Sequence, residues 1–508
     1  MERSVTSERE EGRSAESGAP GAVAARLPTA APTFWGVMRH VHYRNMLGAQ
    51  FVSNIGGWME MFGMQWLVAA KTGSLRAMGF LGAAQLIPIM LFGIPGGVVA
   101  DRVNRKKLLI VTQTMLMLVA AVVALLSYLE FPAGGWWMDV CQAAGRMMGS
   151  TKSPEYVVPL MILGAINGTI MAFNMPAWQV LTPRLVPREE LTAAITLNGI
   201  QFNLSRMVGP GVAGVIMAWQ GATPLFIFNT LSFLGVVLTA TTTPDAPAPA
   251  RRNQHPWHEV REAARFVMHE PGPRAVFLAM TMMSLLAAPL VRVLPLFVMD
   301  VYGLPEKDAE GVSSLLLALQ GIGAVAGGLS LKFIPRWYPK HHFIPMAVMC
   351  AGLSISAFAA TSTVWSGYIA MLVCGFFWIW AFNQSWAAMQ HLVTDVMRGR
   401  VLALANVFAF GATALGSVVL GWIGDGLKQV HGGPLTDARA TQVSILTLSL
   451  PLFIAGIVML SYRTPEVDGM PRRLADGTRP TRNFIKAILG SEHKPRPAAE
   501  ETDAAGRL

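Results

Sequence analysis

Three ionisable side chains lie deep inside apolar stretches that are long enough to cross a lipid bilayer. Glu60 falls near the middle of the first stretch, Arg206 at a similar depth in the fifth, and Arg292 in the seventh. A charge at that depth costs about 3 kcal/mol or more unless it is neutralised, hydrated or paired. Such residues therefore indicate proton transfer or the binding of a charged solute within the membrane.

Glu60 and Arg206 are expected to pair with each other. A carboxylate can take up and release a proton, whereas a guanidinium keeps its charge and needs a partner in the same half of the chain. The pair would serve either as a proton-sensitive element beside a substrate cavity or as a structural clamp. Further polar candidates for this cavity are Asn198 and Gln201, near the face of Arg206, and Asn383 in the tenth apolar stretch.

Arg292 is flanked by Pro289 and Pro295. A guanidinium in this place could hold an anionic or catecholate-like group inside the cavity. The position is also near the outer surface, so the long side chain could instead snorkel to the interface.

The charged loop GVVADRVNRKK spans residues 97–107 and separates two apolar stretches. A carboxylate at the end of a helix can pair with basic groups across a bundle in one conformation and release them in another, so Asp101 predicts a gate on the inner side. Asn104 occupies the turn, and asparagine tolerates the left-handed backbone expected there. The alternative is a basic loop that only orients the chain. The gate candidates are Gly97, Asp101, Arg102, Arg105 and Lys106.

Small residues in the fifth apolar stretch predict a tightly packed helix. Gly209 and Gly214 permit close contact with a neighbouring helix, and Pro210 removes one backbone hydrogen bond. This part of the helix should therefore be able to bend.

The composition is that of a membrane protein. Hydrophobic residues make up 53% of the 508 residues, charged residues only 14%, and the mean hydropathy is +0.43. A soluble chain of this length needs more charge to cover its surface, whereas about 20 apolar residues span a bilayer core. We therefore predict an all-α polytopic membrane protein with about twelve transmembrane helices. The expected ranges are 46–70, 75–100, 107–129, 157–181, 191–218, 222–243, 273–301, 311–334, 342–361, 364–391, 400–424 and 441–462.

The net charge of +10 is spread over alternate loops, which argues against a nucleic-acid partner. With the amino terminus inside, most lysines and arginines fall in inner loops, among them residues 102–107, 184–188 and 251–274. Positive charge favours the cytoplasmic side, where it also meets anionic lipid head groups. The sequence thus predicts a protein of the bacterial cytoplasmic membrane with both termini in the cytoplasm.

Breaks in the apolar pattern divide the chain into five parts. Residues 1–40, rich in Glu, Arg, Ser, Ala and Pro, are expected to form a disordered cytoplasmic tail. Residues 41–243 and 273–463 are the two six-helix halves. The cytoplasmic linker between them, 244–272, is expected to contain an amphipathic helix. Residues 464–508 form a second cytoplasmic tail.

The segments outside the apolar stretches are interpreted as interfacial. The loop 130–156 predicts a short amphipathic helix at the outer surface. In the linker, His255 and His258 form an HxxH pair. Without further ligands, this pair is more typical of a solvated helix face than of a metal site. We predict no metal and no cofactor.

The two halves resemble each other in sequence. Residues 174–214 and 383–421 each place an Asn and a Trp in one helix, followed by Leu-Val, a charged turn and a small-residue stretch in the next helix. Parallel repeats of this kind build transporters whose substrate site lies between two bundles near mid-membrane. In the second half, residues 327–342 are the counterpart of the charged loop but lack its aspartate. Inner-loop contacts there are expected from Asp395, Arg398 and Arg400.

Five separated segments carry a family resemblance, and they are residues 53–74, 97–107, 172–191, 198–214 and 394–401. Residues 97–107 resemble the signature loop of the major facilitator superfamily. The other four segments resemble the branch of that superfamily that contains the bacterial enterobactin exporter, and the resemblance covers residues 40–462. The resemblance implies an exporter of siderophore-like or drug-like small molecules in the cytoplasmic membrane, driven by proton exchange. We expect two pseudo-symmetric bundles within a monomer. Gly209, Pro210 and Gly214 also resemble the helix-five motif of exporters in this superfamily. Fold alone does not fix the substrate.

Other functional classes lack their signatures. We find no HExxH, G-x-S-x-G or phosphate-binding P-loop motif in the sequence, which argues against a polytopic membrane enzyme and against ATP-driven transport. A lysolipid or lipid flippase, or a facilitator on the same fold, stays open, because amphiphilic solutes would use the same apolar cavity.

Overall fold

The computed structural model describes residues 36–129, 136–149, 152–244, 256–334, 340–431 and 434–461, which are almost entirely helical. The α-helices are α1 (Val41–Thr72), α2 (Leu75–Arg102), α3 (Arg105–Tyr128), α4 (Trp136–Met147), α5 (Val157–Leu181), α6 (Leu191–Gln220), α7 (Thr223–Thr242), α8 (Pro256–His269), α9 (Pro271–Met282), α10 (Leu290–Val301), α11 (Glu306–Ser330), α12 (Lys340–Ala359), α13 (Val364–Leu392), α14 (Asp395–His431) and α15 (Pro434–Ser461).

The ends of the chain are only partly described. Residues 1–35 and 462–508 of the predicted tails, and His255 of the linker, lie outside the described residues. Residues 36–39, expected in the first tail, instead form a 3-10 turn, η1 (Gly36–Arg39), with Val37 buried. Burial of Val37 extends the ordered part beyond the apolar stretch from which the boundary was predicted.

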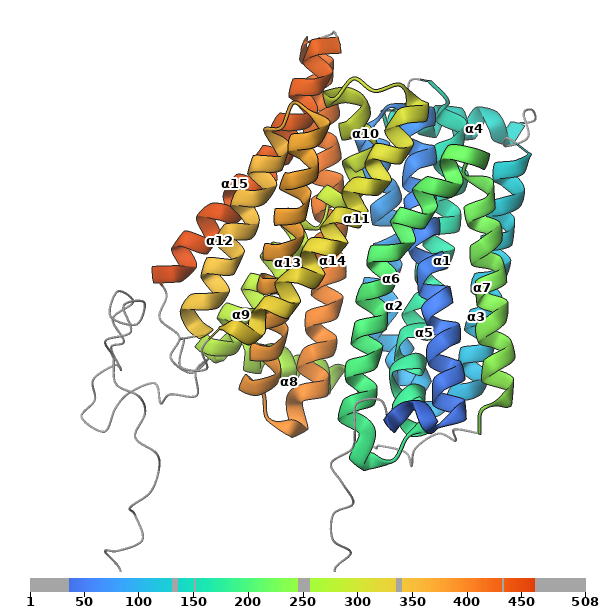
Figure 1. Ribbon diagram of the computed structural model, residues 1–508, viewed down its shortest axis with the longest axis vertical. Coiled ribbons are helices and arrows are strands. Elements are labelled where there is room, and N and C mark those ends of the chain that lie inside the picture. Colours follow the sequence, from blue (N-terminus) through green and yellow to red (C-terminus); the bar gives the residue numbers. More distant parts are fainter. Residues whose placement is uncertain are drawn as a thin grey trace, which may run out of the picture.

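The twelve predicted spans are present as helices. The first six are α1, α2, α3, α5, α6 and α7, and the second six are α9 with α10, then α11 to α15 (Figure 1). By length and hydropathy alone, 10 described helices are long and apolar enough to cross a membrane. The two that fall short, α1 and α6, are the helices that carry Glu60 and Arg206. Polar side chains that face a cavity lower the mean hydropathy of a helix but do not prevent it from spanning a bilayer.

The seventh span is not one regular helix. Between α9 and α10 the chain forms a π-helical turn, η5 (Met283–Ala287), in which Ala288 N donates to Met283 O at 3.1 Å, five residues back. Pro289 has no N–H group to continue the regular ladder, and such turns often interrupt helices at functional positions. The interruption lies directly before the turn that carries Arg292.

The helices form two groups, α1–α7 and α9–α15 (Figure 1). Across the boundary, α2 packs along α14 and α6 packs along α11. The second contact is close because Gly321 of α11 lies against Met207 of α6, where a Cβ atom would be 2.7 Å from the Cα of Met207. The limits 41–243 and 273–463 for the two halves stay a prediction.

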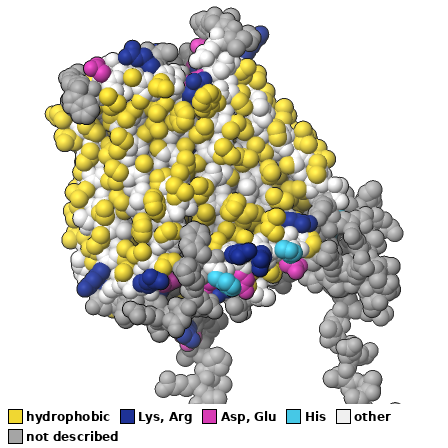
Figure 2. Space-filling model, turned by 180° about the vertical axis from the view of Figure 1, so that it is seen from behind, with side chains coloured by type: hydrophobic (Ala, Val, Ile, Leu, Met, Phe, Trp, Pro, Cys, Tyr) yellow, Lys and Arg dark blue, Asp and Glu magenta, His cyan; other side chains and the backbone are white. Residues whose placement is uncertain are grey.

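The two ends of the helix array differ in what covers them. Helix α8 lies at the end where α1 begins, and α4 lies at the opposite end (Figure 1); we call these the α8 end and the α4 end. Figure 2 shows a broad band of hydrophobic side chains across the middle of the face in view, with charged side chains gathered toward its two ends. Such a band is what a lipid-facing surface requires.

The amphipathic helices expected in the linker and in the loop 130–156 are α8 and α4. Helix α8 is fixed to α14, since Arg400 Nη2 lies 3.0 Å from Glu259 Oε1 and Arg400 Nη1 lies 2.8 Å from Glu262 Oε2. Arg398 instead donates to Gln390 O at 3.1 Å. Arg400 thus makes the inner-loop contact expected of it, whereas the side chain of Asp395 lies outside the described set.

Candidate functional site

A cavity of about 720 Å³ lies between the two helix groups, and both groups line it. Most of its wall is aromatic or apolar, with Trp58, Met61, Met64, Met171, Met175, Trp178, Phe202, Trp378 and Phe410. Uncharged polar side chains are interspersed, among them Gln50, Asn54, Gln85, Gln113, Asn167, Asn174, Gln179, Asn229 and Gln320. The ionisable side chains among the described lining residues are Glu60, Arg206 and Arg292. This size and composition suit a drug-sized ligand.

Glu60 is buried in the middle of α1, with 4% of its surface exposed. Asn229 Nδ2 of α7 donates a hydrogen bond to Glu60 Oε2, and Asn167 Nδ2 of α5 donates to Glu60 Oε1 at 3.4 Å. Helix α7 approaches this closely because Gly56, one turn before Glu60, has no side chain: a Cβ atom there would be 3.0 Å from the Cα of Asn229. Two amide donors therefore satisfy the carboxylate.

The structure does not bring Glu60 and Arg206 together as the ion pair that we expected. Both residues line the cavity. However, the carboxylate bonds Asn229 and Asn167, while the buried Nη2 of Arg206 has no hydrogen-bond partner among the described residues. The expectation failed because it matched charge with charge, whereas neutral amides can also satisfy a buried carboxylate.

Arg292 reaches from α10 across to α2 and is 8% exposed. Its Nη1 donates to Gln85 Oε1 at 2.8 Å. The side chain passes over Gly82, where a Cβ atom would be 2.8 Å from Arg292 Cδ. The space left by this glycine admits the guanidinium to the cavity wall, so Arg292 does not snorkel to the interface. Of the two alternatives for this residue, the structure supports the inward one.

The other three predicted cavity residues are not among the lining residues. Gln201 is buried and its Oε1 accepts from Asn54 Nδ2 at 3.3 Å and from Ser205 Oγ at 3.4 Å, so it joins α1 to α6. Asn198 is half-buried, and Asn383 is exposed on α13. The periodicity of a helix places residues on a shared face but does not give the rotation of that face relative to the cavity.

Asn229, which makes the closest contact with Glu60, was not predicted from the sequence. It is the single asparagine of the apolar stretch 222–243. A search of the apolar stretches for amide side chains, in addition to ionisable ones, would have identified it. Asn174, one of the polar side chains within the apolar stretches, lines the cavity and donates to Thr112 Oγ1 at 2.8 Å. Its counterpart in the repeat, Asn383, does neither.

The small residues of α6 make the close contacts that their sizes predict. A Cβ atom on Gly209 would be 2.7 Å from Trp58 Cβ of α1, and Gly214 lies against Ser314 of α11. Pro210 lines the cavity within an uninterrupted helix. Helix α6 therefore contacts both helix groups through this motif.

The charged loop lies at the α8 end, and its carboxylate pairs locally. Arg105 Nη2 donates to Asp101 Oδ1 at 3.0 Å, and Arg105 is buried although Asp101 is largely exposed. Lys106 Nζ donates to the carbonyl oxygens at the end of α7. Gly97 has open space beside its Cα atom, and Arg102 is exposed. A gate across the bundle stays a prediction.

Asn104 adopts a different backbone from the left-handed one that we expected. Its φ of −63° and ψ of 115° are extended, and its side chain accepts from Lys107 N at 3.2 Å. Asn104 is thus the N-cap of α3, a role for which asparagine is well suited. The turn needs a capping side chain rather than a positive φ.

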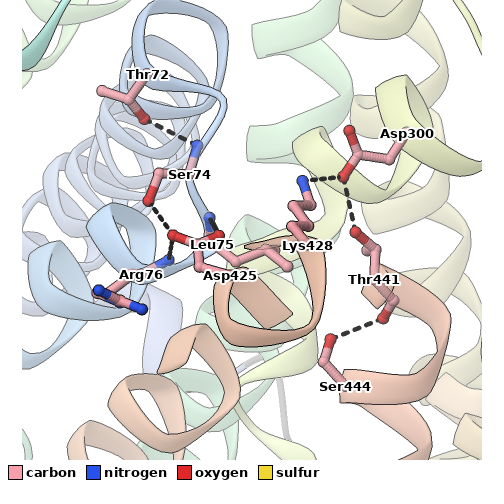
Figure 3. A network of polar contacts seen from close by, with 9 residues as sticks. All are labelled: Thr72, Ser74, Leu75, Arg76, Asp300, Asp425, Lys428, Thr441 and Ser444. Carbon is pink, nitrogen blue, oxygen red and sulfur yellow. Dashed lines mark hydrogen bonds and ion pairs between the residues drawn. The ribbon is translucent and has the colours of Figure 1, made fainter. Parts of the chain in front are cut away.

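At the α4 end, a buried carboxylate of α14 caps the start of α2 (Figure 3). Asp425 is 5% exposed and accepts from Ser74 Oγ at 2.5 Å, Leu75 N at 2.9 Å and Arg76 N at 3.1 Å. The first N–H groups of a helix lack intrahelical partners, and the helix dipole favours a negative charge there. This contact joins the two helix groups and was not predicted from the sequence.

A second contact in the same figure fixes α14 within its own group. Lys428 Nζ lies 2.7 Å from Asp300 Oδ2 of α10, and Thr441 Oγ1 of α15 donates to the same oxygen at 2.7 Å. Asp425 thus lies between two sets of polar contacts, one with the start of α2 and one between α14, α10 and α15 (Figure 3).

Comparison with known proteins adds a family match. A family model described as transmembrane secretion effector matches residues 32–475. The staphyloferrin A transporter of Staphylococcus aureus is 22% identical over 73% of this chain and 87% of its own. The enterobactin exporter EntS of Escherichia coli is 20% identical over 84% and 94%. The multidrug efflux pump Tap of Mycobacterium tuberculosis is 23% identical over 86% and 96%.

Solved structures agree on the fold. A bacterial homolog of the human lysosomal transporter Spinster, inward-facing and unoccupied, has a TM-score of 0.62 at 15% identity, over 90% of this chain and 99% of that one. A D-xylose-proton symporter has a TM-score of 0.61 at 16% identity, over 85% and 99%. At such identities the likeness is one of fold.

Proposed function

Because the chain belongs to the transmembrane secretion effector family of the major facilitator superfamily, we propose that it exports a small siderophore-like or drug-like molecule across the bacterial cytoplasmic membrane. The cavity of about 720 Å³ between the helix groups carries this proposal. Its mostly apolar wall with a few charged groups is typical of a small-molecule site. Two of the relatives, an enterobactin exporter and a multidrug efflux pump, support the outward direction. The cavity is formed within one chain, which supports a monomer.

Transport would proceed by alternating access. The contact of Asp425 with the start of α2 joins the two groups at the α4 end, and the cavity lining includes Gln50 and Trp178 toward the α8 end; both support a conformation that is closed at the α4 end. The basic loops favour the α8 end as the cytoplasmic one, with both termini on that side. This conformation would then take up solute from the cell, and opening of the α4 end would release it.

Glu60 is the proposed proton carrier. It is the carboxylate among the described lining residues, and it faces a cavity through which a proton can arrive. Hydrogen bonds from Asn229 and Asn167 stabilise its ionised form, while a proton taken up from the far side would neutralise it. An exporter of this kind would exchange an incoming proton for an outgoing solute.

Proteoliposomes with an internal pH dye test the proposal. After a pH gradient is imposed, enterobactin, ethidium or lysophosphatidylcholine is added on the side of the α8 end. We expect solute-dependent proton flux in the parent protein and its loss in Glu60→Gln. The matched control is Glu306→Gln, which makes the same change at an exposed position at the start of α11. Solute movement without proton flux would instead identify a facilitator or a lysolipid flippase and would remove Glu60 from the coupling path.

A further inference from the structure

The charges in the cavity do not balance. Among the described lining residues, two arginines face one carboxylate, Glu60. One positive charge is therefore left over when Glu60 is ionised, and two when it is protonated. The remaining polar side chains of the wall, such as Gln50 and Gln113, are neutral.

Neither arginine is neutralised by another protein group in the described structure. Arg292 donates to Gln85, an uncharged amide. The buried Nη2 of Arg206 has no hydrogen-bond partner among the described residues. Taking a guanidinium out of water without an anionic partner is unfavourable. A group that supplies the missing anion would relieve this penalty when it binds.

We propose that the transported solute is an organic anion and that Arg206 and Arg292 bind its acidic group, an inference that rests on the proposed transport through this cavity. Arg206 is the principal anchor, because it lines the cavity and its Nη2 has no hydrogen-bond partner among the described residues, and a guanidinium can bind both oxygens of a carboxylate at once. Arg292 supplies the second positive charge. The apolar body of the solute would lie against Trp58 and Phe202, whose ring centroids are 6.0 Å apart.

The second arginine has a specific consequence for coupling. Proton exchange requires the solute to be bound while Glu60 is ionised. With a single arginine the cavity would then be neutral, whereas with two it keeps a positive charge for the anion. Protonation of Glu60 strengthens the attraction for the anion, so the two ligands do not compete by charge in the cavity. Exchange then depends on which forms of the protein can change conformation. The anion must leave before the form with protonated Glu60 changes back to the conformation that faces the cytoplasm.

Binding of three matched probes tests this inference. The probes share a naphthalene ring and differ in one group: 2-naphthoate is an anion, 2-naphthylmethylammonium a cation, and 2-naphthylmethanol neutral. Equilibrium dialysis against protein in nanodiscs, with empty nanodiscs subtracted, gives three affinities. We expect the parent protein to bind the anion about tenfold or more tighter than the neutral probe, since hydrogen bonds to a charged group of this kind are worth about that factor. Tighter binding of the cation would overturn the proposal.

Single variants assign the preference to residues. Arg206→Gln should remove most of the anion preference while leaving the affinity for the neutral probe within about twofold, and Arg206→Lys should restore part of it. Glu60→Gln should raise the affinity for the anion several-fold, because it removes the negative charge. The matched control Arg261→Gln, at an exposed position of α8, should behave like the parent. An anion preference that survives in Arg206→Gln and in Arg292→Gln would overturn the assignment.

The outcome is separable from that of the transport assay. If the anion binds as expected but no solute crosses the liposome membrane, the binding site stands and the export function is wrong. If ethidium is exported with proton exchange while the naphthoate does not bind, export stands and the anionic class is wrong. Lost affinity for all three probes together, with a changed size-exclusion profile, would mark a folding defect, and Arg206→Lys then provides the decisive comparison.

Discussion

A carboxylate can be kept inside the membrane without a basic partner, as Glu60 shows. Its two oxygens accept from amides on two other helices, Asn229 of α7 and Asn167 of α5. Amides donate without adding charge, so the carboxylate remains able to gain or lose a proton, whereas an adjacent guanidinium would hold it ionised. The uncompensated Arg206 is then available to a solute. One small residue, Gly56, makes this arrangement possible by admitting α7.

Removal of the amide of Asn229 should destabilise the protein through Glu60. We expect Asn229→Leu to lower the free energy of unfolding in detergent by about 1–3 kcal/mol, because a buried carboxylate oxygen loses its donor. In the Glu60→Gln background the same change should cost less, and the difference is the coupling between the two residues. The control is Asn203→Leu, since the hydrogen bond that Asn203 makes within the described part of the chain is to its own helix, at Gly199 O. Additive effects of the two substitutions would contradict the hydrogen bond.

The charged residues of the cavity could be predicted from the sequence, but their partners could not. Glu60, Arg206 and Arg292 stand out because a charge inside an apolar stretch is conspicuous. Asn229 and Gln85, which contact two of them, are uncharged and do not stand out. Which helix supplies a partner depends on how helices rotate and how closely they approach. The closeness of approach depends on glycines such as Gly56 and Gly82, which leave room for a neighbouring helix or side chain. Hydropathy gives no information about such contacts.

At the scale of elements, the connection between α14 and α2 is a helix cap that crosses from one helix group to the other. Ser74 is the N-cap of α2 and accepts from Ala77 N at 3.0 Å, and Asp425 of the distant helix α14 adds a second cap by accepting from Leu75 N and Arg76 N. A cap of this kind is strong only while the two helices are in register. If the α4 end opens in transport, the start of α2 loses its anion, so this contact should favour the closed state.

Loss of the charge on Asp425 should therefore shift the conformational equilibrium. Asp425→Asn keeps the size of the side chain but removes the charge that the helix dipole favours, worth about 1–2 kcal/mol in a partly buried site. We expect the open population at the α4 end to rise about 5- to 30-fold. Spin labels at Met147 and Trp365, which are 82% and 78% exposed, would report it as a longer distance in pulsed electron resonance. Asp308→Asn, an exposed aspartate of α11, is the control. An unchanged distance distribution would show that the cap does not bias the equilibrium.

At the scale of the whole molecule, the sequence predicted the helices better than their ends. Hydropathy located all twelve spans, because each needs an apolar length to cross the bilayer. Hydropathy predicted α14 too short, over 400–424, whereas the helix spans Asp395–His431. The polar ends of a helix that extends beyond the membrane resemble loop sequence. Hydropathy also could not reveal the irregular turn between α9 and α10, which depends on local backbone geometry around Pro289.

The response to membrane potential connects the charge of the solute with the mode of coupling. Each charge moved through a potential of 100 mV contributes about 2.3 kcal/mol. An anion that leaves in exchange for an entering proton moves two charges in the same electrical sense, so a potential that is negative inside should drive this exchange with about 4.6 kcal/mol per 100 mV. An anion that moves alone responds half as much, and an anion that moves together with a proton does not respond.

Proteoliposomes loaded with 2-naphthoate, in which a potassium gradient and valinomycin set the potential, distinguish the three modes of transport. We expect the parent protein to show the steepest dependence of naphthoate transport on the membrane potential. We expect Glu60→Gln to show the intermediate dependence of an anion that moves alone. No dependence in the parent protein would mean that proton and anion travel together, which would refute proton exchange while leaving Arg206 and Arg292 as the anion site.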